Sequence, residues 1–124
     1  MGPARVGAGG VPPLPRAVIA AYIPDLLFGS HVVTSLGAAG HEIRLVSTPS
    51  GSEDADVLIV DLTADAPERI AAPPERRPPT LAFYSHVDVE VRRLAEGAGI
   101  DLVVPRSRMA REGPALIQRL IAKA

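Results

Sequence analysis

The chain has 124 residues, enough for one domain with a single hydrophobic core, and 13 basic against 14 acidic residues give a net charge of −1. This balance provides no field that would hold nucleic acid or an anionic membrane, so neither is an expected partner. Cysteine is absent, which excludes disulfides, thiol nucleophiles and thiolate metal sites, and three scattered histidines do not indicate a zinc centre.

The first 16 residues, MGPARVGAGGVPPLPR, are rich in proline and glycine and contain almost nothing that could be buried. We interpret residues 1–16 as a disordered leader and residues 17–124 as the folded domain. The leader lacks the apolar stretch of a signal peptide, and no later apolar run is long enough to cross a membrane. We therefore expect a cytoplasmic protein.

Five apolar runs are predicted strands. The run at 55–62, ADVLIVDL, is the most apolar and is therefore expected in the centre of the sheet. The complete set of predicted strands is 17–23, 41–47, 55–62, 80–85 and 100–105. His41, at the start of the second run, is expected in a turn and in contact with solvent.

Helical periodicity fills three of the connections. A helix over 25–39 should start at Pro24 and Asp25 and bury residues at helical spacing: Phe28, Val32, Leu36 and Ala39. A second should bury Val87, Val91, Leu94 and Ala98, with Ser85 or His86 capping its start. A third, over 113–124, should present Leu116, Ile117, Leu120 and Ile121 on one stripe.

The two remaining connections are short. Residues 48–54 can hold at most one turn of helix, and a helix starting at Pro67 would be ended within two turns by Pro73 and Pro74. Alternation of strands and helices predicts an α/β fold of three αβα layers, with a five-stranded parallel sheet in the flavodoxin-like order 2-1-3-4-5. Its second and third helices should be shortened, which leaves part of the sheet open to a partner.

In such folds, the functional crevice lies outside the carboxyl ends of the strands. The residues that this rule brings together include Tyr22, Asp25, Asp61, Thr63, Ser85, His86, Arg106 and Ser107. No glycine-rich phosphate loop follows the first strand, where the sequence reads YIPDLLFG, so a dinucleotide site is disfavoured.

This set resembles the receiver domains of bacterial two-component response regulators, over about residues 17–124. By position, Asp61 matches the phosphoacceptor that ends the third strand, and Ser85 matches the hydroxyl that ends the fourth. Ala21 and Tyr22 stand where the family has its metal-binding acid pair, and Arg106 stands at the position of its lysine. The resemblance implies a signalling module that works through contacts with other proteins rather than an enzyme.

The departures predict a pseudo-receiver. Phosphoryl transfer in receivers needs Mg²⁺ held by several oxygens, and Ala21 and Tyr22 supply no carboxylate. We therefore expect no metal and no cofactor, Mg²⁺ being required only if Asp61 is phosphorylated. Three interpretations of Asp61 stay open: an ion pair with Arg106 that mimics a neutralised site, a polar strand end bonded to loop amides, and a working phosphoacceptor.

Two further groups are candidates for binding. Ser85, His86, Arg106, Ser107 and Arg108 could hold a small anion or nucleotide, although solvated arginines are the alternative. Val89, Arg92, Arg93 and Glu96 lie opposite the predicted apolar stripe of their helix. In receivers this helix belongs to the output and dimer surface, so the resemblance implies contact with another protein or with a second copy of the chain.

Overall fold

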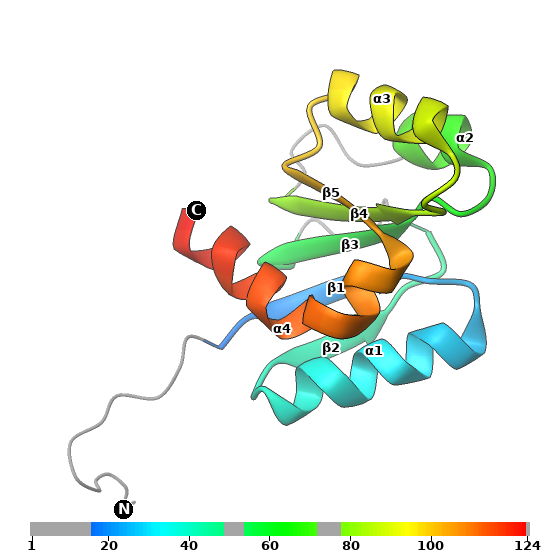
Figure 1. Cartoon of the computed structure of the whole chain (residues 1–124). Helices are drawn as coiled ribbons and strands as arrows, with labels where there is room; N and C mark the ends of the chain where they lie inside the picture. Colours follow the sequence, from blue (N-terminus) through cyan, green and yellow to red (C-terminus); the bar gives the residue numbers. More distant parts are fainter. Residues whose placement is uncertain (1–15, 49–53, 72–77, 124) are drawn as a thin grey trace, which may run out of the picture.

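The computed structural model describes residues 16–48, 54–71 and 78–123, and Figure 1 shows the whole chain. Five strands and four helices are assigned in this part of the chain. They run in the order β1 (Val18–Tyr22), α1 (Leu26–Ala38), β2 (Glu42–Leu45), β3 (Val57–Asp61), α2 (Ala66–Ala71), β4 (Thr80–Tyr84), α3 (Val89–Gly97), β5 (Leu102–Pro105) and α4 (Arg106–Lys123).

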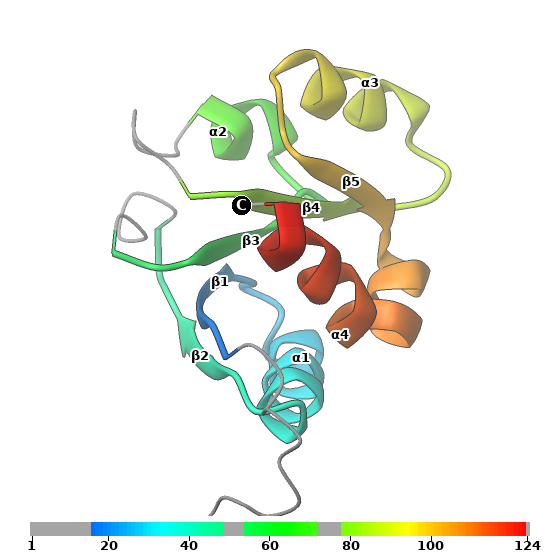
Figure 2. The same ribbon diagram turned by 90° about the vertical axis from the view of Figure 1, so that its left-hand side faces the viewer.

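All four strand pairings are parallel, and the sheet order is β2-β1-β3-β4-β5. Figure 2 shows α2 and α3 covering one face of the sheet and α1 and α4 covering the other. The predicted fold class, the strand order and the five strand positions are therefore confirmed. The predicted leader lies outside the described residues except for Arg16.

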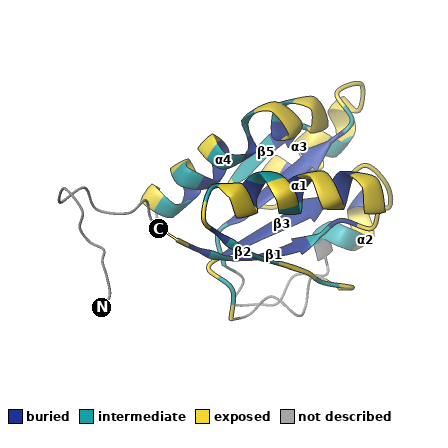
Figure 3. Cartoon of the chain, turned by 90° about the horizontal axis from the view of Figure 1, so that it is seen from below, coloured by how far each residue is buried: buried dark blue, intermediate teal, exposed yellow. Residues whose placement is uncertain are grey.

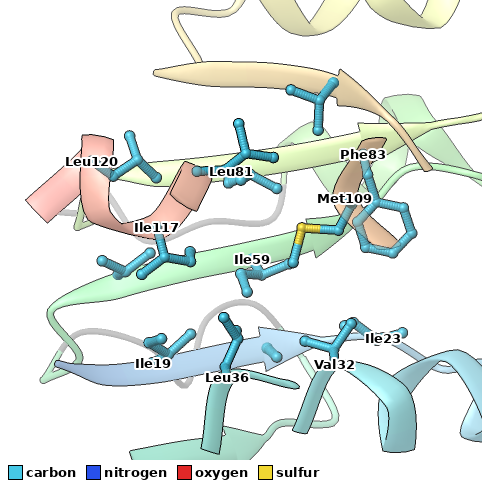
Figure 4. Close-up of a cluster of buried hydrophobic side chains, with 14 of the residues drawn as sticks. Ile19, Ile23, Val32, Leu36, Ile59, Leu81, Phe83, Met109, Ile117 and Leu120 are labelled. Carbon is cyan, nitrogen blue, oxygen red and sulfur yellow. The ribbon is translucent and has the colours of Figure 1, made fainter. Parts of the chain in front are cut away.

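Side chains of successive strand residues point to opposite faces, so the sheet separates two apolar clusters. On the α1 and α4 face, the strand residues Ile19, Ile59, Leu81 and Phe83 pack against the two helices (Figure 4). On the other face, Leu58, Val60, Ala82 and Tyr84 pack under α2 and α3. All five residues of β3 and of β4 are buried, which confirms the central position predicted for β3.

Helix α1 begins where the sequence predicts. The Asp25 carboxylate caps it, because Oδ1 accepts the backbone N–H groups of Leu27 at 3.0 Å and Phe28 at 3.1 Å. Three of the four predicted core residues are buried, Phe28, Val32 and Leu36, whereas Ala39 is partly exposed. Figure 3 shows the exposed outer side of α1 above the buried strands β1 and β3.

The apolar stripe predicted for the helix after β4 lies on the wrong side of that helix. Val87 precedes the helix and is 76% exposed, Leu94 is 44% exposed, and Ala95 is the buried residue of α3. The predicted caps Ser85 and His86 are also wrong, because the Asp88 carboxylate accepts the Val91 N–H at 3.2 Å. This later start turns Val91 and the small Ala95, four residues apart, toward the sheet.

The last helix starts seven residues earlier than predicted, directly after β5. Its first part, Arg106–Arg111, lies between the predicted strand 100–105 and the predicted helix 113–124. A break at Glu112 (φ −124°, ψ 15°) separates this part from the predicted helix, since Pro114 has no N–H and its ring opposes a continuous helix. Leu116, Ile117 and Leu120 are buried as predicted, and Met109 in the added part joins the same core.

The connections after β2 and after β3 were both predicted to be short. Helix α2 has six residues, as the prolines after it predict. Residues 49–53 and 72–77 lie outside the described part, so the expectation for 48–54 falls mostly there. Partly exposed strand residues occur on both faces of the sheet, Tyr22 and Val103 under α2 and α3 and Ile43 and Leu102 under α1 and α4.

His41 was expected to be solvated, but the structure buries it to 6% exposure. Its Nδ1 atom accepts the backbone N–H of Ala17 at 3.0 Å, and its Nε2 atom has no hydrogen-bond partner among the described residues. Burial penalises the charged ring and lowers the pKa of His41 below its ordinary value of 6.5. Protonation would also remove the acceptor that holds the start of β1.

We predict that this histidine makes stability depend on pH. The unfolded chain binds a proton on His41 near pH 6.5, while the folded chain resists it to lower pH. The free energy of unfolding should therefore be highest above pH 7. It should decrease as the pH falls from there through the pKa that His41 has in the folded chain. Urea unfolding between pH 5 and 8 would show a smaller fall in His41→Asn than in the exposed control His86→Asn; equal slopes would contradict the prediction.

Candidate functional site

A cavity of about 650 Å³ opens at the carboxyl ends of the strands, where the crevice of this fold is expected. Segments from four parts of the chain meet there: α1, the loops after β3 and β4, and the start of α4 (Figure 1). Its lining consists of Phe28, Thr63, Ser85, His86, Arg106, Ser107 and Ala110. Asp61 is not among these residues.

Asp61 is buried, with 3% of the residue exposed. Its Oδ1 atom accepts two hydrogen bonds from Thr63, one from the backbone N–H at 2.8 Å and one from the hydroxyl at 2.5 Å. Such a bond to the residue two positions later is the local turn that aspartate forms readily. The interpretation of Asp61 as a polar strand end bonded to its loop is therefore confirmed.

Arg69 is a second partner of Asp61 that the sequence did not reveal. Its Nη1 atom lies 3.9 Å from the Asp61 carboxylate and donates a hydrogen bond of 2.8 Å to the Asp61 backbone carbonyl. The guanidinium also lies 5.1 Å from the centre of the Tyr22 ring, and 12% of the Arg69 side chain is exposed. Asp65 and Arg69 are four residues apart in the sequence, a spacing that indicates an ion pair within a helix, and the two side chains lie 3.8 Å apart. This spacing does not indicate the contact of Arg69 with Asp61.

The expected ion pair between Asp61 and Arg106 is wrong. Arg106 Nη2 instead donates to the Asp25 carboxylate at 3.1 Å, and its guanidinium lies 4.4 Å from the centre of the Phe28 ring. The Asp25 pKa is lowered, chiefly by the backbone hydrogen bond from Phe28; burial opposes this effect, and the positive charge of Arg106 lowers the pKa further. Arg106 thus links the starts of α1 and α4.

The position of the receiver acid pair carries no carboxylate in this fold. Ala21 is fully buried on the α1 and α4 side, and Tyr22 lies under Arg69. Asp25, the nearest acid in sequence, already accepts the α1 amides and pairs with Arg106. Within the described ranges, no three histidine or acidic side chains gather in a way that could hold a metal ion.

The structure brings together four of the five residues predicted to bind an anion. Ser85, His86, Arg106 and Ser107 line the cavity, and no interaction of the Ser85, His86 or Ser107 side chains with another described residue is found. Arg108 does not line it and instead approaches Glu112 at 3.5 Å, one turn later in α4.

No family model and no curated protein matches this chain. Among solved structures, NtrX from Brucella abortus in complex with ADP superposes with a TM-score of 0.70 at 15% identity, over 87% of this chain and 27% of that one. The non-phosphorylated HemR receiver domain from Leptospira biflexa superposes with a TM-score of 0.63 at 17% identity, over 87% of this chain and 94% of that domain.

This chain has the receiver fold. The superposition covers nearly all of the HemR receiver domain, whereas this chain spans only about a quarter of the length of NtrX. Asp61 is the last residue of β3, Ser85 directly follows β4, and Arg106 directly follows β5. Among the described helices, none is long and apolar enough to cross a membrane.

The Arg69 contact generates a stability prediction. Replacing Arg69 by Met removes the donor to the Asp61 carbonyl and leaves a buried carboxylate without its cation, so the free energy of unfolding should fall by about 2 kcal/mol. Urea unfolding measures this loss. The exposed control Arg92→Met should change stability by less than about 0.5 kcal/mol, and equal effects of the two variants would contradict the proposed contact.

Proposed function

We propose that this domain is a receiver-like signalling module that acts through protein contacts without phosphorylation of Asp61. One observation carries the proposal: the Asp61 carboxylate is buried, accepts two hydrogen bonds from Thr63 and lies beside the Arg69 guanidinium. The receiver fold supports the signalling role, and the site supports independence from the phosphoryl group.

Transfer of a phosphoryl group to Asp61 would need an accessible carboxylate oxygen and a metal ion to neutralise the transferred charge. The side chain of Asp61 is 5% exposed, and Oδ1 is already occupied by Thr63. A carboxylate pair is missing at Ala21 and Tyr22. A phosphoacceptor role, with Mg²⁺ as cofactor, would require Thr63 and Arg69 to release Asp61 first.

Arg69 supplies a fixed positive charge at this position. It ties α2 to the end of β3 through the Asp61 carbonyl, and its guanidinium stays charged at any physiological pH. A protein-borne cation therefore replaces part of the neutralisation that receivers obtain from a metal ion. On this proposal, the domain keeps one conformation at the site rather than switching between two.

The face of α3 is the proposed contact surface. Val89, Arg92, Arg93 and Glu96 are all exposed there. Arg92 pairs with Glu96 at 3.4 Å, and Arg93 pairs with Glu90 at 3.3 Å. Surface ion pairs of this kind contribute little to stability, so these side chains are free to serve a partner protein or a second copy in the cytoplasm.

The first test of phosphorylation uses amide NMR spectra of the full chain with Mg²⁺ and beryllofluoride, a mimic of phosphoryl aspartate. We expect no shifts in the wild type or in Asp61→Asn, because the carboxylate is inaccessible and lacks metal ligands. A receiver domain that is known to respond serves as the positive control. Shifts around Asp61, Ser85 and Arg106 that vanish in Asp61→Asn would overturn the proposal in favour of a phosphoacceptor.

A second test separates the α3 contact surface from the core beneath it. Val89→Ser and Arg93→Ala should each change the free energy of unfolding by less than about 0.5 kcal/mol. Ala95→Leu places a larger side chain at a fully buried position and should cost about 1–3 kcal/mol. Thermal and urea unfolding measure both, and a large loss in Val89→Ser or Arg93→Ala would mean that this face is structural.

A further inference from the structure

The cavity at the strand ends has features of a small-molecule site that the proposed signalling role does not use. Its volume of about 650 Å³ lies within the range of ligand pockets, about 300–1,000 Å³. Phe28 and Ala110 are its apolar lining residues, and the remaining lining residues are polar. This division suits a ligand with one polar end and one apolar body.

Three of the polar lining residues carry hydrogen-bond donors that make no bond within the described part of the protein. The hydroxyls of Ser85 and Ser107 and the ring of His86 make no interaction with other described residues. The Thr63 hydroxyl, by contrast, is committed to Asp61. Three side chains with free donors around one cavity indicate a ligand that accepts hydrogen bonds.

Arg106 determines the charge of that ligand. It is the arginine of the lining, and the lining contains no carboxylate. It bonds to Asp25 through Nη2 and lies over the Phe28 ring, so a ligand carboxylate that takes two parallel N–H groups competes with Asp25 for the same guanidinium. A single cation matches a single negative charge, whereas a polyphosphate would call for more.

We propose that this cavity binds a small organic monocarboxylate, with its carboxylate on Arg106 and its apolar body against Phe28 and Ala110. The flat guanidinium fork matches a carboxylate with two parallel hydrogen bonds, and the bond with Asp25 shows that Arg106 already takes a carboxylate at this place. The ligand competes with Asp25 for Arg106. Since Asp61 lies outside the lining, this inference is independent of the proposed function.

Benzoate is the probe, because it joins one carboxylate to one apolar ring. Titrated into the full chain and followed by amide NMR, it should shift the signals of Ser85, His86, Arg106 and Ser107 saturably, with a dissociation constant on the order of 1–10 mM. Benzamide, the neutral analogue of the same shape, should not. Inorganic phosphate should bind more weakly than benzoate.

Variants of Arg106 and Asp25, which form an ion pair, should change benzoate affinity in opposite directions. Arg106→Gln should weaken benzoate binding by about tenfold or more, whereas the control Arg108→Gln, on the same helix but paired with Glu112, should leave it unchanged. Asp25→Asn keeps a residue able to cap α1 and removes the competing charge, so benzoate should bind more tightly. This variant decides the matter even if Arg106→Gln does not fold.

Several results would overturn the inference. These are no saturable shifts with benzoate, equal shifts with benzamide, tighter binding of phosphate than of benzoate, or equal affinity in folded Arg106→Gln and Arg108→Gln. Unchanged or weaker binding in Asp25→Asn would also overturn it, because the carboxylate would then not compete with Asp25.

Discussion

The complete burial of β3 and β4 is the constraint on which the rest of this structure depends. A parallel pair with no exposed residue needs apolar cover on both faces, and α1 with α4 and α2 with α3 provide it. The same burial extends to Asp61 at the end of β3. A carboxylate at such a place must be hydrogen-bonded and paired, which is why Thr63 and Arg69 are engaged there.

Arg106 alone was expected to pair with the acidic residue of the site, but two arginines, Arg69 and Arg106, form the ion pairs there. Arg69 neutralises Asp61 from α2, and Arg106 joins Asp25 and Phe28 on the opposite side of the sheet edge. The Asp61 carboxylate is thereby shielded, and a separate cavity opens beside Arg106. The proposed loss of phosphorylation and the proposed carboxylate site both follow from this separation of the two cations.

Much of the fold could be predicted because apolar runs and their spacing reflect burial directly. The five strands, the buried face of α1 and the core residues Leu116 and Ile117 follow from that pattern. The phase of α3 could not, since Val87 and Leu94 are as apolar as Val91 and the position of the Asp88 cap decides which side faces the sheet. The start of α4 at Arg106 could not be predicted either, because the first residues of this helix are mostly polar and form no apolar stripe.

By itself, the sequence determined the layer architecture, the strand order and the edge of the sheet at which the polar residues gather, because the alternation of apolar runs with helical segments leaves few ways to bury them. Only the tertiary structure decided the contacts of Arg69 with Asp61, of Arg106 with Asp25 and of His41 with Ala17. These contacts join residues from separate segments of the chain, and their choice depends on distances that a linear pattern does not contain.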